Sequence, residues 1–247
     1  MKRFYEKNEL AFSITWIIIY VISMSVADYF SQLVGVEKVI TTPISVILVA
    51  ILVIWINKER LSQKYGLTKG NFPRKTYLYF IPLIITVSVN FWGGVSIQYT
   101  VLESVLYVIS MLCVGCIEEV IFRGFLFKVL SKENLNVAII VSSLTFGFGH
   151  IINLLSGADL ALTLLQVAYA TTAGFAFTII FHKSGSLLPC IVTHSVMNAT
   201  SVFACKAGLT MDVITAIALI VVFVGYAVWI IKANDKKVKE ISSENKE

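Results

Sequence analysis

Long apolar runs alternate with short polar segments along most of the chain. Eight of these runs are close to the ~20 residues that a helix needs to cross ~30 Å of hydrocarbon. We therefore predict an all-α, polytopic membrane protein whose helices enclose a polar intramembrane cavity. The predicted spans are Leu10–Leu33, Val39–Ile56, Tyr77–Ile97, Val101–Leu130, Val137–Leu155, Leu160–Phe181, Leu187–Phe203 and Met211–Ile231.

The first apolar run also resembles a signal peptide, because Ser25-Val26-Ala27 is similar to a small-residue cleavage site. The apolar run continues to Leu33 and further spans follow, so we predict that this helix is not cleaved. The chain then divides into a cytoplasmic N-terminus (1–9), a membrane domain (10–231) and a polar cytoplasmic tail (232–247).

Composition agrees with this division. The chain is 57% hydrophobic and 14% charged, with a mean hydropathy of +0.83, whereas an average soluble domain carries about 25% charged residues. The formal net charge is +5. The basic residues lie in short loops between apolar spans and form no face large enough for a duplex, so we expect no nucleic-acid partner.

The basic residues also predict the orientation in the membrane. Of the 20 lysines and arginines, Lys38 and Lys206 fall in the loops of one side and Arg123 lies within a span. The other 17 fall in the termini and in the loops of the other side. Because cytoplasmic loops carry the excess of Lys and Arg, we predict that both termini are cytoplasmic. The short, Ile- and Lys-rich chain is typical of a bacterial plasma-membrane protein.

Charged residues inside the fourth span are the strongest functional indication. The segment Cys116-Ile-Glu-Glu-Val-Ile-Phe-Arg-Gly124 places Glu118, Glu119 and Arg123 in an apolar run, where each charge costs about 2.5–3.5 kcal/mol on insertion scales. Glu119 and Arg123 are four residues apart and share a helix face, whereas Glu118 points about 100° away. We predict Glu118 as a general base and Glu119–Arg123 as its supporting pair. A buried ion-pair cluster that only locks helices together is the alternative.

Two histidines and an amide occupy other spans. His150 follows Phe146-Gly-Phe-Gly in the fifth span, and His194 and Asn198 are four residues apart in the seventh. A histidine and an amide on one face can donate hydrogen bonds to an oxyanion, or can simply join helices. Glu118, His150 and Asn198 all lie near the middle of their spans, so we expect them to converge.

Together these motifs resemble those of the CPBP family (CAAX protease and bacteriocin-processing, or Abi) of intramembrane endopeptidases. The pattern is Glu-Glu-x-x-x-Arg, then Phe-x-x-x-His, then His-x-x-x-Asn, each on its own apolar helix, and the resemblance covers 102–200. It implies that Glu118 and His150 hold the attacking water. It further implies that His194 and Asn198 stabilise the oxyanion, and that Glu119 and Arg123 orient the site.

The need for a metal is open at this point. The chain contains no His-Glu-x-x-His motif, and we favour catalysis without a cofactor. If zinc were used, its ligands would be Glu118, His150 and His194. The four cysteines are expected to be free thiols, although Cys113-x-x-Cys116 leaves a metal or redox role open.

The expected function is therefore that of an intramembrane endopeptidase. Its partners would be the lipid bilayer and a membrane-associated peptide or protein substrate, reached from the cytoplasmic side. The resemblance implies CAAX-type cleavage, processing of bacterial signalling or bacteriocin peptides, or self-immunity. The alternative is a non-catalytic scaffold or regulator, or a small transporter, on the same helices. The sequence specifies no oligomeric state.

Overall fold

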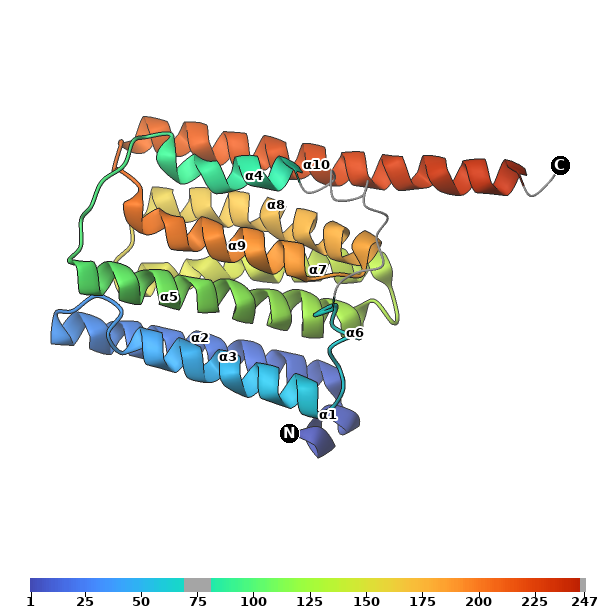
Figure 1. Ribbon diagram of the computed structural model, residues 1–247, viewed down its shortest axis with the longest axis horizontal. Helices are drawn as coiled ribbons and strands as arrows, with labels where there is room; N and C mark the ends of the chain where they lie inside the picture. The colour runs from blue at the N-terminus through green and yellow to red at the C-terminus, as the bar shows by residue number, and fades with distance from the viewer. Residues whose placement is uncertain (69–80, 245–247) are drawn as a thin grey trace.

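Helices make up almost all of the computed structural model, which describes residues 1–68 and 81–244 (Figure 1). No strand occurs in these two ranges, where Val95 and Ala204 form an isolated bridge. The α-helices are α1 (Lys2–Lys7), α2 (Glu9–Val34), α3 (Thr41–Lys58), α4 (Ile81–Ser88), α5 (Val101–Glu118), α6 (Lys128–Leu130), α7 (Leu135–Gly149), α8 (Leu160–Ser184), α9 (Leu188–Thr200) and α10 (Leu209–Glu244).

The predicted all-α, polytopic membrane fold is confirmed. Six helical stretches in the described part of the chain are long and apolar enough to span a membrane: Glu9–Val34, Thr41–Lys58, Val101–Leu130, Leu135–Ser156, Leu160–Ser184 and Leu209–Ala233. The predicted count of eight spans is not confirmed.

The two remaining predicted spans contain shorter helices. In the predicted third span, Tyr77–Ile97, residues 77–80 lie outside the described residues and α4 has 8 residues. In the predicted seventh span, α9 has 13 residues. Neither helix alone reaches the ~20 residues of a full crossing.

Several helix ends follow from local sequence. Asn8 caps α2 by accepting a hydrogen bond from the Ala11 amide at 2.9 Å. Thr100 and Glu103 form a reciprocal capping box at the start of α5. Gly185, at φ 69°, ends α8 in the left-handed region, where glycine carries no steric penalty. The apolar runs therefore stop where the sequence supplies caps.

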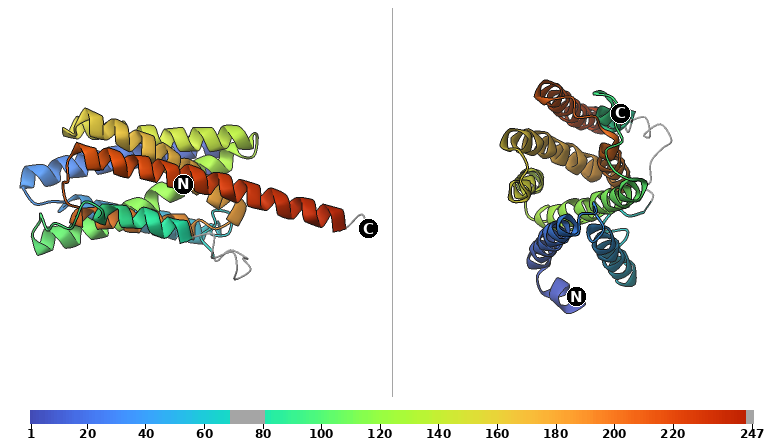
Figure 2. Two further views of the ribbon diagram at one scale, coloured as in Figure 1. Left: turned by 90° about the horizontal axis from the view of Figure 1, so that it is seen from above. Right: turned by 90° about the vertical axis from the view of Figure 1, so that its left-hand side faces the viewer.

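The helices run along one common direction and pack side by side (Figure 2). Seen end-on (right-hand view of Figure 2), α2 and α3 lie on one side of α5, and α10 lies on the opposite side of the bundle. The last helix, α10, continues to Glu244, past the predicted span end at Ile231.

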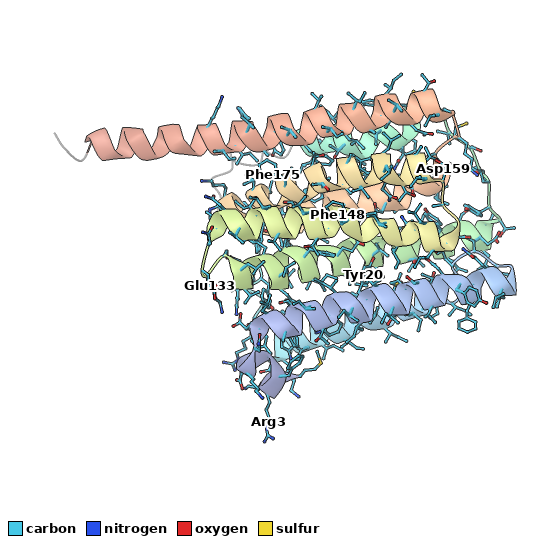
Figure 3. All side chains as sticks on the ribbon, turned by 180° about the vertical axis from the view of Figure 1, so that it is seen from behind. Arg3, Tyr20, Glu133, Phe148, Asp159 and Phe175 are labelled. Atoms are coloured by element: carbon cyan, nitrogen blue, oxygen red, sulfur yellow. The ribbon has the colours of Figure 1, made fainter. Side chains whose placement is uncertain are left out.

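The two ends of the bundle differ in charge. At the end that carries the N-terminus, the Lys64 and Lys132 ammonium groups lie 3.1 and 2.8 Å from Glu9, which joins the loop after α3 to the loop before α7. We call this the basic end. At the opposite end, Lys38 pairs with Asp28 at 2.8 Å. Figure 3 shows the two ends of the bundle, with Arg3 and Glu133 at the basic end and Asp159 at the opposite end.

Candidate active site

The fourth span changes helix type within the predicted catalytic motif. Regular α-helix ends at Glu118, and Glu119–Phe127 continues as a π-helix in which every residue is buried. A π-helix carries more residues per turn, so it redirects the side chains that follow it, and such segments often occur at functional sites. Sequence analysis did not predict this change, because a π-helix has no period of its own in so short a segment.

Glu119 is the centre of a fully buried ion pair. Its Oε1 atom lies 3.1 Å from an Arg123 guanidinium nitrogen, and both side chains are 0% exposed. The same oxygen lies 2.9 Å from His194 Nδ1 on α9. The carboxylate therefore holds two cationic or hydrogen-bonding side chains from two helices at once.

Glu118 has partners that its helical position did not predict. Its Oε1 accepts a 2.7 Å hydrogen bond from the Tyr20 hydroxyl on α2, and its Oε2 lies 3.4 Å from His194 Nε2. The Glu118 side chain is 12% exposed, whereas that of Glu119 is 0% exposed. Of the two adjacent carboxylates, Glu118 is thus the one that a small molecule can reach.

Glu118 reaches a cavity of about 360 Å³ that His150 and Asn198 also line. The His150 Nδ1 atom lies 3.1 Å from the Phe146 carbonyl oxygen. Because a carbonyl can only accept, Nδ1 is the donor in this contact, and in the neutral ring Nε2 is then the acceptor. Asn198 lies one turn after His194 on α9, as its spacing predicts.

Phe146 connects the three motifs. Its ring centroid lies 4.0 Å from the Arg123 guanidinium carbon, and edge contacts join it to His150 at 5.3 Å and to His194 at 5.5 Å. Phe146 is 3% exposed. A cation over an aromatic face in a desolvated site gains ~2 kcal/mol, so Phe146 both fixes Arg123 and shields the ion pair from water.

Close helix contacts set the positions of these side chains. A Cβ on Gly115 of α5 would lie 2.6 Å from the Ser195 backbone of α9, beside His194. A Cβ on Gly147 of α7 would lie 1.9 Å from the Thr171 hydroxyl of α8. The Gly147 contact agrees with the expectation from the Phe-Gly-Phe-Gly sequence, whereas Gly149 faces open space.

All six predicted site residues therefore lie in one region of the bundle. Sequence reasoning missed Tyr20, which lies on α2 (labelled in Figure 3) and donates a hydrogen bond to Glu118. A tyrosine in the middle of an apolar span was the available indication, since its hydroxyl needs a partner there.

The zinc alternative would require Glu118, His150 and His194 to act as ligands of one ion. Within residues 1–68 and 81–244, no group of three or more His, Cys, Asp or Glu is arranged to hold a metal ion. The Cys113 and Cys116 thiols are free, as are Cys190 and Cys205.

The segment that carries the six predicted residues matches a known protein family. Residues 100–200 match the family model described as type II CAAX prenyl endopeptidase Rce1-like. The match begins at the cap of α5 and ends with α9, so it covers the helices that carry the six predicted residues. No curated protein matches the chain at a significant level.

Proposed function

Because the chain belongs to the CAAX-protease (CPBP) family of intramembrane endopeptidases, we propose that it hydrolyses a peptide bond of a membrane-associated substrate by a glutamate-activated water. The substrate class is a lipid-anchored CAAX-type protein or a bacterial signalling or bacteriocin peptide. The observation that carries the proposal is that Glu118 borders the same cavity as His150 and Asn198.

Water activation is assigned to Glu118 and His150. A water in the cavity donates one proton to the Glu118 carboxylate while its oxygen attacks the peptide carbonyl carbon. His150 accepts the second hydrogen bond of this water at Nε2, since Nδ1 is held by Phe146. General-base catalysis of this kind typically contributes 10²–10⁴-fold to the rate.

The tetrahedral oxyanion is assigned to His194 and Asn198. With both ring nitrogens protonated, His194 donates from Nδ1 to Glu119 and offers Nε2 to the oxyanion, and the Asn198 amide is the second donor. The buried group then contains two carboxylates, one guanidinium and one imidazolium, and its formal charge is zero. Such balance avoids leaving a charge unpaired in a low dielectric.

The intermediate then collapses. The carbon–nitrogen bond breaks, and protonated Glu118 returns its proton to the leaving amine, which restores the starting carboxylate. Glu119 and Arg123 touch no substrate in this scheme. They are positioning residues that fix the ring of His194.

Cleavage by the purified full-length protein tests this proposal. The probes are a fluorogenic peptide with a farnesylated CAAX end and its unlipidated counterpart. We expect Glu118→Gln to lower kcat at least ~10²-fold, with little change in KM, because glutamine keeps the oxygen that accepts from Tyr20.

Glu103→Gln is the matched control. It changes a carboxylate on the same helix, and glutamine can serve in a capping box as glutamate does, so its cleavage rate should equal that of the unaltered chain. Equal rates for Glu118→Gln and Glu103→Gln would exclude Glu118 as the base.

A further inference from the structure

We propose that the catalytic cavity opens at the end of the bundle opposite the basic end, so that the protease takes a peptide segment presented on the non-cytoplasmic side of the membrane. The chemistry rests on the proposed function. The side of entry rests on the shape of the cavity, on the packing around it and on the distribution of charge.

From Glu118 the cavity extends toward the end of the bundle opposite the basic end. On α5 its lining residues lie about one turn apart, from Tyr107 through Met111 and Val114 to Glu118. Tyr107 is 11 residues nearer than Glu118 to the start of α5, which corresponds to about 16 Å along the helix. On α2 the lining runs from Tyr20 toward the opposite end and reaches Asp28.

Two further cavities at this end adjoin the first. A cavity of about 470 Å³ shares Asn90, Gln166, Tyr169 and Met197 with it. Another, of about 700 Å³, shares Tyr107 and Ser201 with it. Each of the three has lining residues in segments that connect helices at this end, such as Lys38, Ala158 and Lys206. We call the three cavities together the approach to Glu118.

Packed side chains close the cavity toward the basic end. Between the Glu119–Arg123 pair and the basic end lies a layer of four aromatic side chains, each at most 2% exposed. They are Tyr65, Phe125, Phe127 and Phe181.

These rings form two contacting pairs. The centroids of Tyr65 and Phe125 are 4.9 Å apart, and those of Phe127 and Phe181 are 6.1 Å apart. Interiors packed in this way leave no passage for a peptide. We call these four residues the aromatic plug.

Charge fixes which end faces the cytoplasm. In the described part of the chain, thirteen Lys and Arg residues belong to the basic end, against Lys38 and Lys206 at the other: Lys2, Arg3, Lys7, Lys58, Arg60, Lys64, Lys128, Lys132, Lys183, Lys232, Lys236, Lys237 and Lys239. Excess Lys and Arg mark the cytoplasmic side. The plug therefore faces the cytoplasm and the cavity faces away from it.

This arrangement changes the expectation of cytoplasmic access. Position along the helix placed Glu118 near the middle of its span, and distance along a helix does not determine which side is open. A substrate reaching this site has its cleavable segment on the outer side, as a peptide does after export or a membrane protein does in an external loop.

Cysteine labelling in intact cells that express the full chain tests the orientation. Cys205 is exposed and lines the approach, so a membrane-impermeant maleimide should label it without permeabilisation, and Cys205→Ser should abolish the signal. Lys132→Cys, placed in the Cys205→Ser chain at the basic end, should be labelled only after permeabilisation. The reverse pattern would overturn the proposal.

A second cysteine tests the opening of the cavity. Ser25 lies on the lining between Tyr20 and Asp28, and Ser25→Cys in the Cys205→Ser chain should react in intact cells with anionic sulfonatoethyl methanethiosulfonate. Failure of this residue to react from outside, while Cys205 is labelled, would overturn an outward-facing cavity.

Labelling does not require catalysis, so it separates this inference from the proposed function. A Glu118→Gln chain should label like the unaltered one. Absence of cleavage with outward labelling would refute the protease assignment alone. Cleavage with labelling from the cytoplasmic side would refute the side of entry alone.

Discussion

Removing both partners of the buried Glu119–Arg123 pair should destabilise the protein by less than the sum of the two single removals. Arg123→Met deletes the guanidinium and leaves the Glu119 carboxylate 0% exposed with His194 as its remaining partner. Glu119→Gln leaves the Arg123 charge buried, with the Phe146 ring beneath it. Both substitutions preserve most of the side-chain volume, so packing changes little.

The size of the expected stability loss follows from the burial and geometry of the Glu119–Arg123 pair. Breaking a buried pair from one side typically destabilises by about 3–5 kcal/mol. We expect a value near the lower limit for each single change, because Glu119 retains His194 and Arg123 retains a cation–π contact. The double change removes both charges, so its loss should be smaller than the sum of the two by about 1–3 kcal/mol.

Activity should behave differently from stability. His194 Nδ1 bonds the same Glu119 oxygen as Arg123, so the double change loses the charge that orients the His194 ring even where stability is recovered. Misplacing one oxyanion donor lowers kcat by about 10²–10³.

The assay is a double-mutant cycle on the full chain in detergent. Reversible unfolding gives the free energies, and cleavage of the farnesylated peptide gives kcat. A double variant whose stability loss equals the sum would refute the coupling. A double variant that cleaves at the original rate would refute the positioning role.

Three further outcomes are expected. Tyr20→Phe removes a 2.7 Å hydrogen bond to the Glu118 carboxylate; such bonds contribute about 1.5–3 kcal/mol, so kcat should fall at least ~10-fold with KM unchanged. Treatment with a chelator, followed by metal analysis of the protein, should leave cleavage unchanged. Gly147→Ala places a Cβ 1.9 Å from the Thr171 hydroxyl, and the forced separation of α7 and α8 should lower stability by about 1–3 kcal/mol in thermal unfolding.

Controls come from the same helices. Tyr29→Phe changes an exposed tyrosine on α2 and should not alter kcat; an equal fall in both tyrosine variants would point to a general effect of α2. Gly149→Ala meets open space, so a loss as large as that of Gly147→Ala would contradict the steric explanation. Activity lost in chelator and restored by zinc would replace the metal-free mechanism.

The sequence by itself determined whatever depends on neighbours along one helix. Apolar runs of about 20 residues predict the long helices, and caps such as Asn8 and Thr100 mark their ends. Spacing of four residues predicted that Arg123 reaches Glu119, which holds at 3.1 Å. These relations are local, so a helical period of 3.6 residues is enough to predict them. The catalytic roles of the site residues stay predictions.

Tertiary packing alone decided the rest. Tyr20 reaches Glu118 across 98 positions of sequence, and His194 lies between two carboxylates of another helix. Neither contact has a sequence period, because both depend on how closely helix backbones approach at glycines such as Gly115. The open and closed directions of the cavity depend in the same way on side chains from distant segments filling, or not filling, the same space.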